Sequence, residues 1–170
     1  MELTPPQHID SEIQDSERLV RSVYYPIHFK NKTTHLLVKS LFESPKGKDE
    51  VSVLRLEYTT ATFCKQHAQK NVNPPVRREY RGLAVLTAKQ IRQQKQGAYQ
   101  ANVKASKLDG LPMHADIFYG YVMPLEKDVP IPPEIGLLIE KLTQVAAYYH
   151  DSKPEISEWL DGELLPKSEK

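Results

Sequence analysis

Several short stretches of the chain alternate between hydrophobic and polar residues, which is the pattern of a β-strand with one buried face. The alternation is cleanest over residues 99–106, YQANVKAS. Residues 82–86, GLAVL, are wholly apolar and indicate a strand that is buried on both faces. The remaining predicted strands cover the ranges 18–29, 34–42, 51–58 and 113–122. These strands are numerous enough to form a sheet.

The longest helical pattern lies near the C-terminus, over residues 133–149. Pro132 and Pro133 suit its start, and Pro154 prevents a further helix. We expect one helix whose apolar side is buried in the core. Its apolar residues recur at intervals of three and four positions: Ile135, Leu138, Ile139, Leu142, Val145, Ala146 and Tyr149.

Two shorter helices are also predicted. One covers residues 59–71, with Thr59 or Thr60 as the N-cap and Asn71 at its end. The other begins at the capping-box sequence TAKQ, residues 87–90. One side of the first helix is expected to carry Phe63, Cys64, His67 and Ala68.

These elements predict an α+β fold in a single domain. A largely antiparallel sheet would carry the long C-terminal helix on one face, together with the two short helices. We expect residues 1–16 to form a flexible acidic N-terminal arm, residues 17–151 to form the domain, and residues 152–170 to form an acidic C-terminal tail. Trp159, Leu160, Leu164 and Leu165 could dock that tail on the domain.

The composition excludes a disordered chain and a membrane-spanning one. Hydrophobic residues make up 39% and charged residues 26% of the 170 residues, and no apolar run approaches the ~20 residues that span a bilayer. The N-terminus lacks the basic start and apolar centre of a secretory signal. Cys64 is the single cysteine, which excludes an intrachain disulfide and favours a reducing compartment. We therefore expect a soluble cytoplasmic protein without membrane association.

The charge is unevenly distributed, although the net charge is only +1. Residues 77–107 carry eight basic residues against Glu79 alone, a local net charge of +7, whereas both ends of the chain are acidic. This segment is either an ordinary solvated face or a surface for an anionic partner. Arg77, Arg78 and Arg81 are the candidate nucleic-acid-binding residues.

The predicted strand 113–122 contains the sequence MHADIF, with an acid and a base two positions apart. Because side chains alternate across a strand, His114 and Asp116 are expected to share one face. Such a pair can act as general acid and base, so both are catalytic candidates. The alternative is a solvated face on which the two residues hydrogen-bond or pair with cations.

Arg21 and Arg55 lie among apolar residues of the strands 18–29 and 51–58. An unpaired charge in such a place is costly, so each arginine needs a partner. Asp116 or Glu57 would be that partner in a purely structural role. In a functional role, Arg21, Arg55, His114 and Asp116 would together bind the phosphate or carboxylate of a ligand.

The motifs of the common cofactor and metal sites are missing from the sequence. There is no Cys/His spacing typical of zinc, no glycine-rich phosphate loop and no G-x-S-x-G sequence. No cofactor and no metal are therefore predicted. Cys64 is interpreted as a small core residue.

Four segments carry a resemblance to known proteins: RLVRSVYYPIHF, EVSVLRLEYTTATFC, GLAVLTAKQI and MHADIFYG. Over residues 18–150 the chain resembles a group of small bacterial proteins with L-x-R-x-V, S-V-x-R and H-A-x-I strands. That group has no established activity, so the resemblance implies no function. The chain is also similar to ADP-ribosyltransferase-like folds, which implies roles for Arg21, Ser52 and Asp116. Asp116 stands where those folds usually carry Glu.

Two classes of function follow from these patterns. The first is a non-catalytic binding or accessory protein that holds an anionic ligand, a nucleic acid or a protein partner. The second is a small nucleotide-using transferase or hydrolase with a His, Asp and Arg site. The absence of a specific catalytic motif favours the first.

Overall fold

The computed structural model describes residues 8–30, 37–72 and 78–168 of the chain. Within them, a six-stranded sheet has the order β6-β7-β2-β1-β3-β8, and every neighbouring pair is antiparallel. The predicted α+β fold with a largely antiparallel sheet is confirmed. The strands of this sheet are β1 (Arg18–Tyr25), β2 (Val51–Arg55), β3 (Glu79–Thr87), β6 (Asn102–Ala105), β7 (His114–Phe118) and β8 (Ala147–His150), and a separate hairpin joins β4 (Lys95–Gln96) to β5 (Tyr99–Gln100).

The helices begin at the residues that the capping patterns predict. The hydroxyl of Thr60 accepts from the backbone N–H of Phe63, and Thr87 forms a reciprocal capping box with Gln90. These bonds satisfy N–H groups that have no partner inside the helix. The helices are α1 (Ala61–Lys70), α2 (Ala88–Arg92) and α3 (Pro133–Val145), with short 3-10 helices η1 (Lys39–Phe42) and η2 (Leu56–Tyr58).

The predicted helix over 133–149 is wrong in its last turn, because the chain leaves the helix at Val145 and continues as β8. Strand β8 pairs with β3, with Tyr149 opposite Leu83. Without β8, β3 would present a row of unpaired backbone groups at the edge of the sheet. Sheet pairing therefore replaces the last helical turn.

The predicted strand over 34–42 is also wrong where the structure describes it. Residues 34–36 lie outside the described residues, and Lys39–Phe42 form η1. Leu41 and Phe42 are consecutive and both are fully buried. A strand would have turned one of them away from the core.

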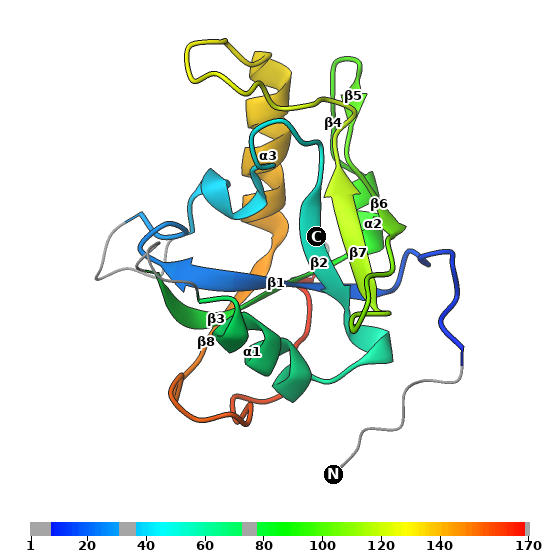
Figure 1. Cartoon of the computed structure of the whole chain (residues 1–170). Helices are drawn as coiled ribbons and strands as arrows, with labels where there is room; N and C mark the ends of the chain where they lie inside the picture. The colour runs from blue at the N-terminus through cyan, green and yellow to red at the C-terminus, as the bar shows by residue number, and fades with distance from the viewer. Residues whose placement is uncertain (1–7, 31–36, 73–77, 169–170) are drawn as a thin grey trace.

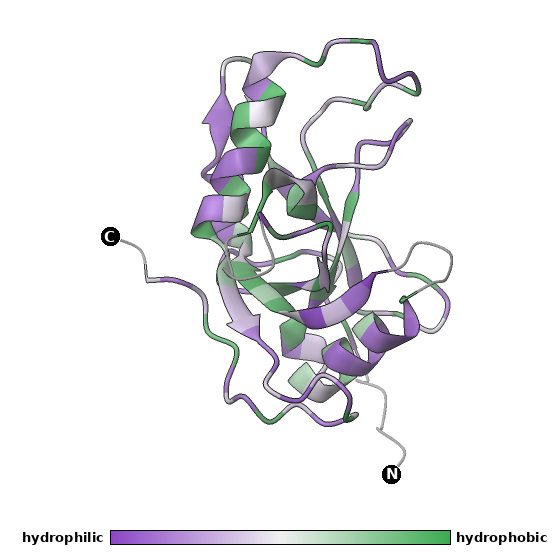
Figure 2. Cartoon of the chain, turned by 90° about the vertical axis from the view of Figure 1, so that its left-hand side faces the viewer, coloured by the Kyte–Doolittle hydropathy of each residue, from purple (hydrophilic) through white to green (hydrophobic). Residues whose placement is uncertain are grey.

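Both faces of the sheet are covered, so the domain has three layers (Figure 1). Helix α3 lies on one face with η1 and α2, and it buries Ile135, Leu138, Ile139 and Leu142 there, as predicted. Apolar and polar residues alternate along α3 in Figure 2, as expected for a helix with one buried side. Helix α1 and the C-terminal segment lie on the other face, where Cys64 is almost fully buried.

The described parts of both chain ends pack on the domain. In the expected flexible arm, Ile9 and Ile13 are buried, so residues 8–16 are held in place, while residues 1–7 lie outside the described residues. In the C-terminal segment, Trp159 and Leu164 are buried and dock it, as anticipated, whereas the two other leucines are half exposed. Among the described helices, none combines the length and the apolar character required to cross a bilayer.

The sheet is split near its middle, between β1 and β2. These strands pair only at Leu19 with Arg55 and at Val20 with Leu54. Beyond these pairs they diverge: in Figure 1, β1 runs across the picture while β2 and β7 run up and down it. Side chains from both strands occupy the space that this divergence opens, and the candidate site lies there.

Candidate functional site

A pocket of about 370 Å³ opens where β1 and β2 separate. Apolar side chains of both strands line it, together with a set of cationic and hydrogen-bonding groups. No aspartate or glutamate is among the described residues that line it. Its basic side chains are two arginines and three histidines: Arg21, Arg78, His28, His67 and His114.

Arg21 shares a face of β1 with Leu19 and Val23, as predicted, and its guanidinium spans the gap between the strands. Its Nε donates to the carbonyl oxygen of Leu41 and its Nη1 to that of Ser52, each at 2.9 Å. Burial lowers the pKa of this guanidinium, and nearby Arg78 lowers it further. No described residue accepts a hydrogen bond from Nη2, and no described carboxylate pairs with Arg21.

Arg78 lies just before β3 and also lines the pocket. Its guanidinium stacks 4.2 Å from the ring centre of Tyr24, and its Nη2 donates to the carbonyl oxygen of Asn71 at 2.6 Å. Its Nε is buried and has no hydrogen-bond partner among the described residues. The pocket therefore holds two guanidinium groups, and neither has a carboxylate from the described part of the chain.

His28 follows β1 and is buried beside these arginines. Its Nδ1 accepts a hydrogen bond from the backbone N–H of Tyr24 at 3.0 Å. Burial lowers the pKa of His28 to about 3, with further contributions from Arg21 and Arg78. The ring is therefore neutral, and its proton is assigned to Nε2 because Nδ1 is an acceptor. His28 offers the pocket a neutral N–H donor.

His114 and Asp116 lie on the same face of β7, so the predicted alternation is confirmed. The carbonyl oxygen of Ser106, 2.9 Å from His114 Nδ1, can only accept, so Nδ1 carries the proton. His114 Nε2 is 3.9 Å from Asp116 Oδ1, which is too far for a hydrogen bond. Asp116 Oδ1 is buried and has no partner among the described residues.

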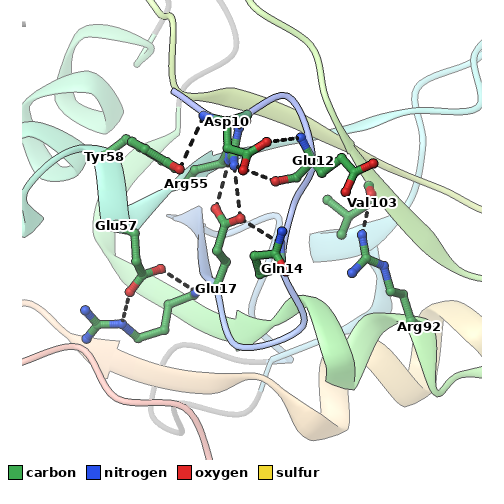
Figure 3. Close-up of polar contacts among 10 residues, drawn as sticks. Asp10, Glu12, Gln14, Glu17, Arg55, Glu57, Tyr58, Arg92 and Val103 are labelled. Atoms are coloured by element: carbon green, nitrogen blue, oxygen red, sulfur yellow. Dashed lines mark hydrogen bonds and ion pairs between the residues drawn. The ribbon is translucent and has the colours of Figure 1, made fainter. Parts of the chain in front are cut away.

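The expected pairing of Asp116 with Arg21 or Arg55 is wrong, because Arg55 has a different carboxylate. Figure 3 shows Arg55 held by Glu17, with Nε and Nη2 at 2.9 and 3.0 Å from the two carboxylate oxygens. Its Nη1 donates to the carbonyl oxygen of Asp10 at 2.6 Å. All three nitrogens are engaged and the side chain is fully buried, so Arg55 anchors the N-terminal arm and lies outside the pocket.

The three arginines predicted to bind nucleic acid do not form one group in the described structure. Arg77 lies outside the described residues. Arg78 lines the pocket over Tyr24, whereas Arg81 lies over the ring of Tyr25 at 5.5 Å and pairs with Glu79. The rings of Tyr24 and Tyr25 pack in different cores, on opposite sides of β1. Nucleic-acid binding by these residues stays a prediction.

Sequence reasoning did not select His28 and His67 as site residues, although the sequence contains signals for both. His28 comes three residues after the strand that carries Arg21 and lies in the turn that begins at Pro26. His67 belongs to the apolar side of α1 that was predicted to pack inward with Cys64 and Ala68. Burial lowers the pKa of His67, and His114 and Lys70 lower it further.

Comparison of the chain with known protein families, with curated proteins and with solved structures finds no match. The described residues also contain no group of three or more His, Cys, Asp and Glu side chains arranged to hold a metal ion. The functional assignment therefore rests on the geometry and charge of the pocket itself.

Proposed function

We propose that the protein binds an anionic ligand in the pocket between β1 and β2, without chemistry of its own. The observation that supports this most directly is Arg21, a partly buried cation that no described carboxylate neutralises. Removing a cation from water without a counter-charge is unfavourable, and a bound anion would offset that cost. Arg78 adds a second guanidinium to the pocket, and no described carboxylate pairs with it.

The remaining pocket groups support an anion rather than a cation. No acidic side chain, Asp116 included, is among the described residues that line the pocket. The carboxylate of Glu17 is paired with Arg55. His28 presents an N–H donor, and Ser22, Ser52 and Asn71 line the pocket with further polar groups. Donors in a partly enclosed site bind an anion more strongly than they would in water.

Thermal melts of the full chain with added anions test this proposal. Wild-type protein should melt at a higher temperature in sodium phosphate or sulfate than in chloride at the same ionic strength. A ligand at a hundred times its Kd stabilises the folded state by about 2.7 kcal/mol. Arg21→Met should remove the response, and Arg78→Gln should weaken it.

Arg81→Gln is the matched control, since Arg81 pairs with Glu79 and does not line the pocket. It should respond to anions as the wild type does. A wild-type melting temperature that no phosphate, sulfate or carboxylate ion changes would contradict the proposal.

The second candidate function, a nucleotide-using transferase or hydrolase, is favoured by His114. Since Nδ1 is held by Ser106, Nε2 is the nitrogen of this ring that is left to accept a proton, and His114 lines the pocket. An unprotonated imidazole nitrogen next to a bound phosphate can act as a general base. Release of product from nucleotides, measured with wild type and His114→Asn, separates the two candidates: a binding protein gives no turnover with either.

The proposal extends to a nucleic-acid or protein partner and to a cytoplasmic location. Arg78 and Arg81 lie apart, over different tyrosine rings. The proposal of nucleic-acid binding therefore rests on the local charge of residues 77–107. The proposal of an accessory protein also includes binding to a protein partner. The single thiol of Cys64 supports a cytoplasmic location.

A further inference from the structure

We infer that the anion is the phosphate group of an organic phosphate monoester, and that the organic part of the ligand lies against Leu108 and Leu111. This inference rests on the proposed function, since it names the ligand class of the same pocket. It concerns binding alone and requires no chemical step.

The first observation is how each arginine presents its donors. A single arginine holds a carboxylate best through Nε and Nη2 together, and Arg55 holds Glu17 in this way. In Arg21, Nε is already bonded to Leu41, and in Arg78, Nη2 is already bonded to Asn71. Neither pocket arginine therefore offers the complete edge that a carboxylate would use.

The second observation is that the unused donors come from separate elements. Arg21 Nη2 belongs to β1, Arg78 Nη1 comes from just before β3, and His28 Nε2 lies in the turn after β1. None of the three has a hydrogen-bond partner among the described residues. A tetrahedral phosphate has three terminal oxygens that point in different directions, so it can accept from each donor singly. A planar carboxylate has two oxygens in one plane and fits this set less well.

The third observation is the apolar side of the pocket. Its volume of about 370 Å³ is at the lower end of the ~300–1,000 Å³ typical of small-molecule sites, and inorganic phosphate would fill only part of it. Val20 and Leu54 line it from the sheet, and Leu108 and Leu111 line it from the loop before β7. Leu108 is half exposed, at 50%. An organic group attached to the phosphate would cover it.

The test compares three probes by isothermal titration calorimetry of the full chain at one pH and ionic strength. Phenyl phosphate carries both features, benzoate keeps the ring but has a carboxylate, and inorganic phosphate lacks the ring. Phenyl phosphate should bind at least tenfold more tightly than either of the others. Benzoate or inorganic phosphate binding as tightly as phenyl phosphate would overturn the inference while the proposed anion site stands. Binding of none of the three would overturn both.

Two variants test whether the phosphate lies against the arginines and the organic group lies against Leu108. Leu108→Ser, at an exposed position, should lower the affinity for phenyl phosphate at least threefold and leave that for inorganic phosphate unchanged. Arg78→Gln should lower both affinities, and Arg81→Gln should change neither. Equal affinity of wild type and Leu108→Ser for phenyl phosphate would overturn the placement of the organic group, provided that their melting temperatures agree.

Discussion

His28 connects the electrostatics of the pocket to the stability of the protein. Burial and the two neighbouring arginines hold the pKa of His28 at about 3 in the folded state, whereas an unfolded chain has a histidine pKa near 6.5. Below pH ~6.5 the unfolded state therefore takes up a proton that the folded state does not. The free energy of unfolding should fall as the pH drops from ~6.5 towards 3, by up to roughly 4 kcal/mol from this group.

Urea unfolding of wild type and His28→Asn at a series of pH values measures this contribution. Asn can keep an acceptor near the position of Nδ1 but does not titrate, so the difference between the two proteins should shrink or reverse as the pH falls. His8→Asn, at an exposed position, is the control and should follow the wild type. Parallel curves for wild type and His28→Asn would mean that the pKa of His28 is not lowered in the folded protein.

The sequence predicts the site residues to the extent that their arrangement is local. The shared face of His114 and Asp116 follows from the period of a strand, and so does the position of Arg21 among apolar residues. The partner of Arg55 does not follow, because Glu17 is 38 positions away and reaches it only through the fold of the arm. The convergence of His28 and Arg78 depends on the pairing of the end of β1 with the start of β3, where Tyr25 lies opposite Glu79, and no local pattern encodes that pairing.

At the scale of elements, α3 is the helix that its apolar spacing predicts up to Val145. Leu142 is fully buried between this helix and the sheet. Leu142→Ala should lower the free energy of unfolding by about 2–5 kcal/mol, because it leaves a cavity in a packed core. Leu137, which is 47% exposed on the same helix, is the control, and Leu137→Ala should cost less than about 1 kcal/mol. Denaturant unfolding measures both, and equal losses would mean that α3 does not bury this side.

The boundary between α3 and β8 shows where helical spacing stops being informative. Ala146 and Tyr149 continue the helical interval, but Ala147 and Tyr149 also alternate as in a strand. A short segment that satisfies both periods takes its structure from the partner it meets, here the open edge of β3. The same ambiguity explains η1, whose apolar residues suit a strand in sequence but are buried together in the core.

At the scale of the whole molecule, the C-terminal segment is joined to α1 by a buried ion pair. Lys65 is fully buried, and its Nζ lies 2.9 Å from Asp151 Oδ2. The same nitrogen donates to the carbonyl oxygens of Lys153 and Glu158, and the hydroxyl of Tyr80 donates to Asp151. Every hydrogen of this ammonium therefore has an acceptor, which offsets the cost of burying it.

Lys65→Met should destabilise the protein by about 3–5 kcal/mol, because it leaves the carboxylate of Asp151 buried without its cation. It should also expose the segment after residue 151 to proteases before the rest of the domain. Lys70→Met, at an exposed position on the same helix, is the control. Urea unfolding and limited proteolysis measure these effects, and a Lys65→Met protein as stable and as resistant as Lys70→Met would show that the pair contributes nothing.

The C-terminal segment packs against α1, so this core can form only after the segment has been synthesised (Figure 1). Trp159 and Leu164 leave the ribosome well after Cys64 and Ala68, yet all four residues belong to the same buried core. Chains grow at about 5–20 residues per second, and domains generally fold as units. Until Trp159 and Leu164 emerge, the nascent chain exposes an apolar surface along α1 that is accessible to a chaperone.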